Sequence, residues 1–298
     1  MPNIVSVMVR EEIRLLKPFI GKLSIEKARA FQDALGELEA KIVGGRVAFE
    51  DVPMDGFEAC LARPEDEKDK RRAILYLHGG AYVAGNLKYA RGFAGMLAEK
   101  TRQTVLSAAY RLAPENPFPA AVEDALTAYR YLLELGYEPR HISFAGESAG
   151  GGLIYCLCLA IKELGLPLPA ALVGISPWTD LTFGGASHKV NAKRDPALSE
   201  KALRRYAAVY AKGQEKNPLA SPIFGDLTGL PPSLLLAGGD ELLLSDAEIL
   251  AARLIDCGCK CELYVEDGLW HVYVLYGIPE AREALNKIAC FLESDHDG

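Results

Sequence analysis

The chain has 298 residues, of which 50% are hydrophobic and 24% are charged. This length and balance predict one large α/β domain, or such a core with a small appended cap. The formal net charge is −7, and no basic stripe suggests a nucleic-acid partner. Residues 68–72 are mildly basic but lie among acidic residues, which favours a solvated loop. No apolar run is long enough to span a bilayer, and residues 1–9 lack the features of a signal peptide. We therefore expect a cytoplasmic protein.

The seven cysteines are odd in number and no secretion signal accompanies them, which predicts reduced thiols. Cys257, Cys259 and Cys261 alternate, so that a strand starting there would place all three on one face. No fourth ligand with zinc-like spacing lies nearby. We interpret the three as small buried hydrophobic side chains and expect no metal.

Residues 1–45 have the apolar periodicity of amphipathic helices, with Ser24 as the expected cap of a second helix. Such helices need an apolar surface to cover. They could form a lid over a pocket or pack on the core, and the pattern alone does not decide between these two interpretations.

Eight segments have the pattern of β-strands. The first two, 47–52 and 57–62, are predicted to form a hairpin-like pair. Six further strands alternate with helical segments: 73–77, 105–110, the run that begins at 142, 170–175, 233–237 and 260–265. This alternation predicts a mostly parallel, doubly wound sheet. Residues 182–222 interrupt it with a polar loop and a helix, which we interpret as an insertion above the sheet.

A short apolar run ends in Gly146-Glu147-Ser148-Ala149-Gly150, and an apolar segment of helical length follows. This is the G-x-S-x-G nucleophile elbow in its expected strand–turn–helix context. The two glycines leave room for a tight turn, and Ser148 is expected at its apex. The helix N-terminus adds partial positive charge beside the serine. Because short motifs also occur by chance in glycine-rich loops, the rest of the chain has to support this interpretation.

Ser148, Asp240 and His271 each follow the end of a predicted strand, in the chain order serine, acid, histidine of α/β-hydrolases. A neutral imidazole can take the serine proton, and a carboxylate on its other nitrogen fixes the tautomer. His271 is the histidine that follows the last strand. Asp240 competes with Glu241 and Asp246 for the role of the acid, and we favour Asp240 because it directly follows a glycine pair at the strand exit.

The tetrahedral intermediate of acyl transfer carries a negative oxygen, and each backbone N–H aimed at it lowers the barrier by about 3 kcal/mol. Ala149, which follows the nucleophile, is expected to supply one donor. The loop His78-Gly79-Gly80 after an earlier strand is expected to supply the others, from Gly79 and Gly80. We interpret His78 as a residue that fixes this loop by hydrogen bonding.

Taken together, these motifs resemble the hormone-sensitive-lipase-like (family IV) group of α/β-hydrolase carboxylesterases, over roughly residues 70–293. The resemblance rests on the glycine loop 78–82, the segment 110–115, the elbow 146–150, the segment 176–180, the Asp240 segment and the segment 270–272. It implies Ser148, Asp240 and His271 as the catalytic triad. It also implies an α/β-hydrolase domain over 46–298, with a cap formed by residues 1–45 and by the insertion at 182–222.

The resemblance further implies a serine carboxylesterase that cleaves short-chain acyl esters of small molecules through an acyl-enzyme, without metal or organic cofactor. The sequence departs from the group at two points. Ala81 stands where the glycine loop has a third glycine, and Asp240-Glu241-Leu242 stands where the group has Asp-Pro-Leu. The first could narrow access for bulky alcohol groups, and the second leaves the choice between neighbouring carboxylates open.

Two other classes of function remain open. One is a non-catalytic ligand-binding protein on the same fold, against which the presence of His271 argues. The other is a peptidase or acyltransferase with the same triad. The last strand, 260–265, is predicted to lie at an edge of the sheet, which leaves a homodimer possible.

Overall fold

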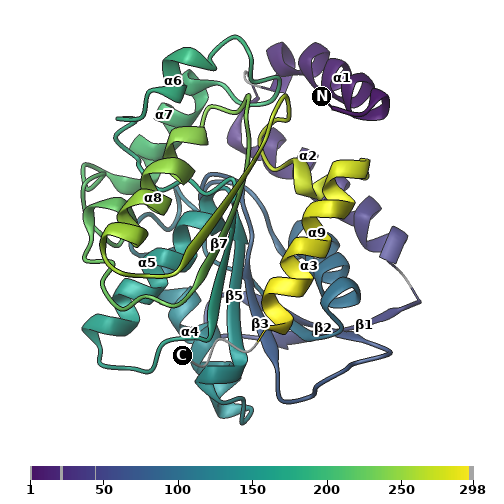
Figure 1. Ribbon diagram of the computed structural model, residues 1–298, viewed down its shortest axis with the longest axis vertical. Coiled ribbons are helices and arrows are strands. Elements are labelled where there is room, and N and C mark those ends of the chain that lie inside the picture. The colour runs from purple at the N-terminus through teal and green to yellow at the C-terminus, as the bar shows by residue number, and fades with distance from the viewer. Residues whose placement is uncertain (1, 21–22, 44, 295–298) are drawn as a thin grey trace.

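The computed structural model describes residues 2–20, 23–43 and 45–294. They form an eight-stranded sheet in the order β1-β2-β4-β3-β5-β6-β7-β8 (Figure 1). β1 and β2 form an antiparallel hairpin, β2 is also antiparallel to β4, and all other pairs are parallel. The strands are β1 (Val47–Pro53), β2 (Glu58–Pro64), β3 (Ala73–Leu77), β4 (Thr104–Ala109), β5 (Ile142–Glu147), β6 (Ala171–Ile175), β7 (Ser233–Gly238) and β8 (Cys261–Glu266). The predicted mostly parallel, doubly wound sheet is confirmed.

Helices cover both faces of this sheet (Figure 1). One face carries α3 (Leu87–Thr101) and α9 (Pro279–Glu293), and the other carries α4 (Ala120–Glu134), α5 (Ala149–Glu163) and α8 (Leu244–Asp256). Each face therefore has its own buried apolar cluster, and the central strands are apolar along their whole length. Every residue of β3 is buried, as expected of a strand covered on both sides.

The parallel pairing of the central strands positions the site. It brings the carboxyl ends of β3, β5, β6, β7 and β8 to one edge of the sheet, where open α/β sheets place their ligands. The segments that follow these strands carry the glycine loop, Ser148, the candidate acids and His271.

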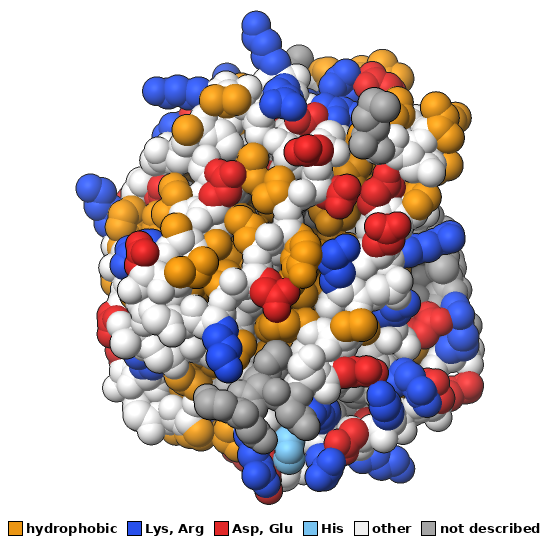
Figure 2. Space-filling view, viewed as in Figure 1, with side chains coloured by type: hydrophobic (Ala, Val, Ile, Leu, Met, Phe, Trp, Pro, Cys, Tyr) orange, Lys and Arg blue, Asp and Glu red, His pale blue; other side chains and the backbone are white. Residues whose placement is uncertain are grey.

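The N-terminal residues form α1 (Ile4–Ile20) and α2 (Ile25–Val43), with Ser24 Oγ accepting a hydrogen bond from the Lys27 amide at 3.4 Å. α2 packs closely on α3, because a Cβ at Gly36 would lie only 2.3 Å from the Tyr89 Cα atom. α1 is amphipathic but exposes hydrophobic side chains to solvent (Figure 2). The most exposed are Ile4, Met8, Leu15 and Phe19.

The segment 182–222 contains α6 (Ser187–Val190) and α7 (Glu200–Ala211), and the 3₁₀ turn Pro222–Phe224 closes it. It lies at the same end of the molecule as α1 (Figure 1). The Arg205 guanidinium donates a hydrogen bond to the Leu23 carbonyl at 3.3 Å, which joins this segment to the N-terminal helices.

Cys257, Cys259 and Cys261 are half-buried against the apolar cluster, and only Cys261 belongs to β8. The expectation that all three are buried on one strand face is wrong, because the first two lie in the turn that follows α8. Within the described residues, no three His, Cys, Asp or Glu side chains are arranged to hold a metal ion. No helix in that part of the chain has the length and apolarity needed to cross a membrane.

Candidate active site

Ser148 occupies a strained turn between β5 and α5. Its φ of 54° and ψ of −119° are unusual for a residue with a side chain. The turn leaves no space for a Cβ at two positions, so it is possible only because both are glycine. A Cβ at Gly150 would lie 1.9 Å from the Leu77 carbonyl oxygen, and a Cβ at Gly146 would lie 2.4 Å from the Gly150 carbonyl oxygen. The Ser148 amide donates to the Ile175 carbonyl at 2.9 Å, which ties the turn to β6.

His271 lies in the loop after β8 and reaches back over the sheet edge. Its Nε2 atom is 2.9 Å from Ser148 Oγ, although the two residues are 123 positions apart. Ser148 is 9% and His271 5% exposed, so this contact is shielded from bulk water. The Val272 amide donates to Ser176 Oγ at 2.9 Å, which holds the histidine loop against the segment after β6. The structure thus brings together the predicted nucleophile and base.

The carboxylate beside His271 belongs to Glu241. Its Oε2 atom lies 3.3 Å from His271 Nδ1. Asp240 instead forms ion pairs with Arg10 at 2.6 Å and Arg194 at 2.5 Å. The expectation that Asp240 faces the histidine is therefore wrong. The turn after β7 directs these two neighbouring side chains to different partners, and the sequence gives no direct sign of that turn's geometry.

Asp246, the third candidate acid, holds a different segment. Its Oδ1 atom accepts hydrogen bonds from the Thr179 and Asp180 amides, both at 2.9 Å. Its Oδ2 atom lies 3.3 Å from Nε2 of His188. Asp246 therefore fixes the loop that follows β6 and has no contact with His271 among the interactions of the described residues.

Glu241 is fully buried, and burial raises the pKa of its carboxyl above the ordinary value. Hydrogen bonding to His271, and to Ser176, acts in the opposite direction and favours the ionised form. Asp195 also raises the pKa of Glu241 by charge repulsion, and its own Oδ2 accepts the Leu242 amide at 2.8 Å. The Glu241 carboxyl thus lies in a site with little water, and the His271 imidazole is the main group that favours its ionised form.

The loop that carries the acid is fixed by residues from the insertion. Asn191 Nδ2 donates to the carbonyls of Gly239 at 3.1 Å and Glu241 at 2.9 Å. We did not predict Asn191, Asp195 or Arg194 as residues of the site. Their only sequence signal is their position in the segment that interrupts the β/α alternation.

The glycine loop after β3 lies beside the nucleophile, because a Cβ at Gly79 would be 3.1 Å from that of Ser148. The Gly79 amide, however, donates to Glu147 Oε1 at 2.5 Å. Gly79 was expected as an oxyanion donor, and this expectation is wrong because its N–H is already used. Among the described residues, the Gly80 and Ala81 amides have no such partner.

Ala149 begins α5, so its amide has no carbonyl partner within the helix. Ala81 has a φ of 55°, a left-handed conformation that suits glycine better. Ala81 therefore has the backbone conformation of a glycine, although it replaces the third glycine of the loop found in the hormone-sensitive-lipase-like group. The amides of Gly80, Ala81 and Ala149 therefore have no acceptor among the contacts of the described residues.

Two buried titratable groups fix the glycine loop. Glu147 Oε1 accepts the Gly79 amide and also the Tyr89 hydroxyl at 3.0 Å, and burial raises the pKa of Glu147 to about 7. His78 Nδ1 lies 2.7 Å from the Gly79 carbonyl oxygen, and its ring stacks on Tyr110 with centroids 4.3 Å apart. Burial lowers the pKa of His78 to about 4, so its imidazole is neutral at pH 7. The expected loop-fixing role of His78 agrees with these contacts.

Comparison with known proteins identifies the family of the chain. The family profile described as "alpha/beta hydrolase fold" matches residues 74–275. The chain belongs to the α/β-hydrolase family. The "Acetyl-hydrolase" of Streptomyces hygroscopicus is 43% identical over 226 residues, which are 75% of this chain and 76% of that protein.

Solved structures of esterases are similar along almost the whole chain. An esterase of the bacterial hormone-sensitive lipase family has a TM-score of 0.90, with 34% identity and 100% of both chains covered. The esterase EstE5, soaked with p-nitrophenyl butyrate, has a TM-score of 0.91, with 34% identity over 99% of this chain and 100% of its own. The predicted α/β-hydrolase fold, the hormone-sensitive-lipase-like family and the class of carboxylic ester hydrolase are confirmed.

The raised pKa of Glu147 predicts a specific pH dependence of stability. Because the folded-state pKa of about 7 exceeds the ordinary 4.5, the folded protein holds a proton that the unfolded chain releases between these values. The free energy of unfolding therefore falls as pH rises through this range, by about 3 kcal/mol from this group. Glu147→Gln should remove that part of the slope, measured by urea unfolding at pH 5 and pH 8. Equal slopes for both proteins would contradict the assignment.

Proposed function

We propose that the protein hydrolyses carboxylic esters through Ser148, His271 and Glu241, with the Gly80, Ala81 and Ala149 amides as the oxyanion hole. The observation that carries this proposal is the pair of contacts on one imidazole. Nε2 is 2.9 Å from the Ser148 hydroxyl oxygen, and Nδ1 is 3.3 Å from the Glu241 carboxylate. A histidine held in this way can accept a proton from one side while its other nitrogen is fixed.

In the first half of the reaction, Ser148 Oγ attacks the carbonyl carbon of the ester and its proton passes to His271 Nε2. The carbonyl oxygen becomes an oxyanion, which the three backbone amides stabilise. The intermediate collapses when the bond from carbon to the alcohol oxygen breaks and that oxygen takes the proton from Nε2. Alcohol leaves, and the acyl group remains on Ser148.

In the second half, water takes the place of the alcohol. His271 accepts a proton from the water as it attacks the acyl carbon, and returns it to Ser148 Oγ when the acid is released. Glu241 stays ionised and stabilises the imidazolium in both halves. The low exposure of Ser148 and His271 strengthens these interactions because little water screens them.

We propose short-chain acyl esters as the substrates. One relative carries the name acetyl-hydrolase, and p-nitrophenyl butyrate was soaked into a structurally similar esterase. Both names concern small acyl groups. The burial of Ser148 is compatible with a small acyl group next to the nucleophile.

We also propose that residues 1–45 and 182–222 act as the cap over the site. Arg29 of α2 donates to the Val83 carbonyl at 2.8 Å, directly after the glycine loop. Asn191 and Asp195 of the insertion hold the segment of the catalytic acid. Both segments thus contact the loops of the site itself.

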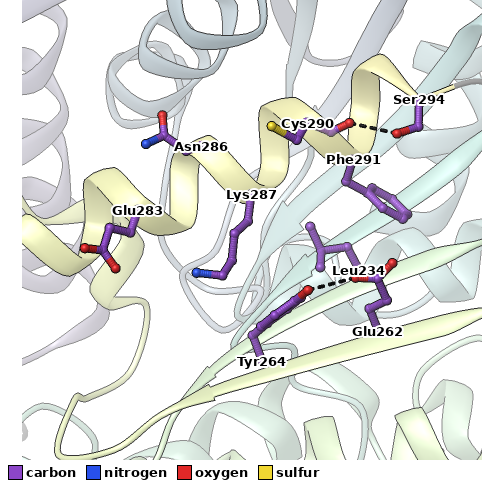
Figure 3. A pocket seen from close by; sticks show the side chains of 9 residues that line it. All are labelled: Leu234, Glu262, Tyr264, Glu283, Asn286, Lys287, Cys290, Phe291 and Ser294. Atoms are coloured by element: carbon purple, nitrogen blue, oxygen red, sulfur yellow. Dashed lines mark hydrogen bonds between the residues drawn. The ribbon is translucent and has the colours of Figure 1, made fainter.

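A homodimer through β8 is a further proposal. β8 is one of the two outer strands of the sheet, and Tyr264 and Val265 are 40% and 38% exposed on it. Beside it, a groove between β8 and α9 is lined by Tyr264 and by Lys287 of α9 (Figure 3). A second copy could extend the sheet along this edge. The cytoplasmic location stays a prediction from the sequence.

The catalytic assignment is tested by substitution at the three acidic and nucleophilic positions. Ser148→Ala should lower kcat on p-nitrophenyl acetate by at least about 10³-fold, because only the oxyanion hole and binding remain. Glu241→Gln should lower it by about 10³- to 10⁴-fold, by loss of the charge beside the imidazole. Asp240→Asn is the matched control and should cost about tenfold or less. A greater loss with Asp240→Asn than with Glu241→Gln would contradict the choice of acid.

The substrate class is tested with p-nitrophenyl esters of increasing acyl length. We expect the highest kcat/KM at two to four carbons, as the family resemblance implies, and a steep fall for long chains. An anilide of the same acyl group should be turned over far more slowly, and added acceptor alcohols should not divert the product to a new ester. Fastest turnover of long acyl groups, of the anilide or of the acceptor would indicate a lipase, a peptidase or an acyltransferase instead.

The dimer is tested by sedimentation. Wild type should sediment at twice the mass of the chain, and Val265→Lys should sediment as a monomer, because a charge on an edge strand disfavours pairing with a second sheet. Ile255→Lys, which is also exposed but on α8, is the control and should stay dimeric. A monomeric wild type would exclude the proposed dimer.

A further inference from the structure

Arg10 of α1 connects three loops that surround the proposed catalytic residues. Its guanidinium donates hydrogen bonds to the Gly268 carbonyl and to the Arg194 carbonyl, the latter at 3.0 Å. The same group forms an ion pair with Asp240 at 2.6 Å. Its side chain is only 15% exposed, on the side of α1 where Ser6 is also buried.

Each of these three contacts is close in sequence to a residue of the site. Gly268 lies three positions before His271, and Asp240 lies directly before Glu241. Arg194 is followed by Asp195, which accepts the Leu242 amide at 2.8 Å. A single side chain from the N-terminal helix thus connects the histidine loop, the acid loop and the insertion.

The contacts also set the charge beside the acid. Asp240 is 4% exposed and lies between two guanidinium groups, those of Arg10 and Arg194. The three groups together carry one net positive charge, centred on the residue that directly precedes Glu241. Charges in such a poorly hydrated place are weakly screened and act on neighbouring protonation equilibria over several ångströms.

We propose that Arg10 is a positioning residue for the ester hydrolysis: it holds the acid and histidine loops in register and, with Asp240, sets the charge at the catalytic pair. The inference rests on the proposed function of Ser148, His271 and Glu241. Arg10 touches neither substrate nor the reacting atoms. It acts through Asp240 and the Gly268 carbonyl.

Other charged groups lie on the elements packed around the site and stay unchanged in the test. They are Asp195 and Arg194 from the loop after α6, Lys17 from α1, Glu266 from the end of β8, Asp267 from the histidine loop, and Glu280 and Glu283 from α9. Since these groups are common to all variants, a difference between variants reports the charge that was removed.

The test uses two substitutions of opposite sign. Arg10→Met removes a positive charge, favours the imidazolium and should move the acidic limb of the kcat/KM profile to higher pH by about 0.5 unit. Asp240→Asn removes a negative charge and should move that limb to lower pH by a similar amount. The full chain is assayed on p-nitrophenyl acetate, at the wavelength where both forms of the product absorb equally. In the double variant the two shifts should cancel, so that its acidic limb lies near that of wild type.

A structural role alone would give a different result. Loosened loops would lower kcat in both variants without shifts of opposite direction. Arg10→Lys keeps the charge but loses the fork of donors, so it should keep the wild-type limb while kcat falls by about tenfold. Arg14→Met is the control, because Arg14 pairs with Glu11, an exposed residue of the same helix. Its kcat and its acidic limb should match those of wild type.

The outcomes separate this inference from the proposed function. If Ser148→Ala keeps its activity, the proposed function fails. If Ser148→Ala is inactive but Arg10→Met and Asp240→Asn shift the limb in the same direction, or in neither, the function stands and the role of Arg10 is overturned. Should Arg10→Met fail to fold, as judged by circular dichroism, Asp240→Asn and Arg10→Lys still decide, because the first must shift the limb downward and the second must leave it in place.

Discussion

The close approach of α5 to the ends of β3 and β5 is the constraint on which the site depends. Gly146 and Gly150 permit it, since a side chain at either position would overlap a backbone carbonyl. This contact forces Ser148 into a positive φ and presents its hydroxyl at the sheet edge. The cost of such a conformation, of order 1 to 3 kcal/mol, is tolerated because the surrounding sheet and helix fix the turn from both sides.

Buried carboxylates then organise the loops around this serine. Glu147 accepts the Gly79 amide and holds the glycine loop, while Asp246 accepts two amides of the loop after β6. Each bonds backbone N–H groups that would otherwise be unsatisfied in a dry interior. Glu241 has the imidazole as its partner instead. Buried carboxylates thus have two uses at one edge of the sheet: Glu147 and Asp246 fix loop backbone, whereas Glu241 lies beside the imidazole that contacts Ser148.

The sequence was sufficient to predict what depends on strand order and local motifs. The elbow, the parallel sheet and the meeting of Ser148 with His271 follow from the positions of strands and glycines along the chain. It was insufficient where the orientation of a side chain depends on distant residues. Asp240 and Glu241 are adjacent carboxylates, and their partners Arg10 and His271 are far away in sequence. Similarly, Gly79 is a glycine at the position expected of an oxyanion donor, but its amide donates to the Glu147 carboxylate.

The two N-terminal helices divide their contacts between the two halves of the site. Arg29 of α2 donates to Val83 and Ala113, on the side of the glycine loop that would bind the oxyanion. Arg10 of α1 contacts the acid and histidine loops, on the side that would move the proton. Both guanidiniums donate to backbone carbonyls and also pair with a carboxylate, Asp240 for Arg10 and Glu115 for Arg29. Helices attached in this way cannot shift as a unit without loosening the contacts on both sides of the site together. The N-terminal helices are therefore part of the proposed catalytic geometry.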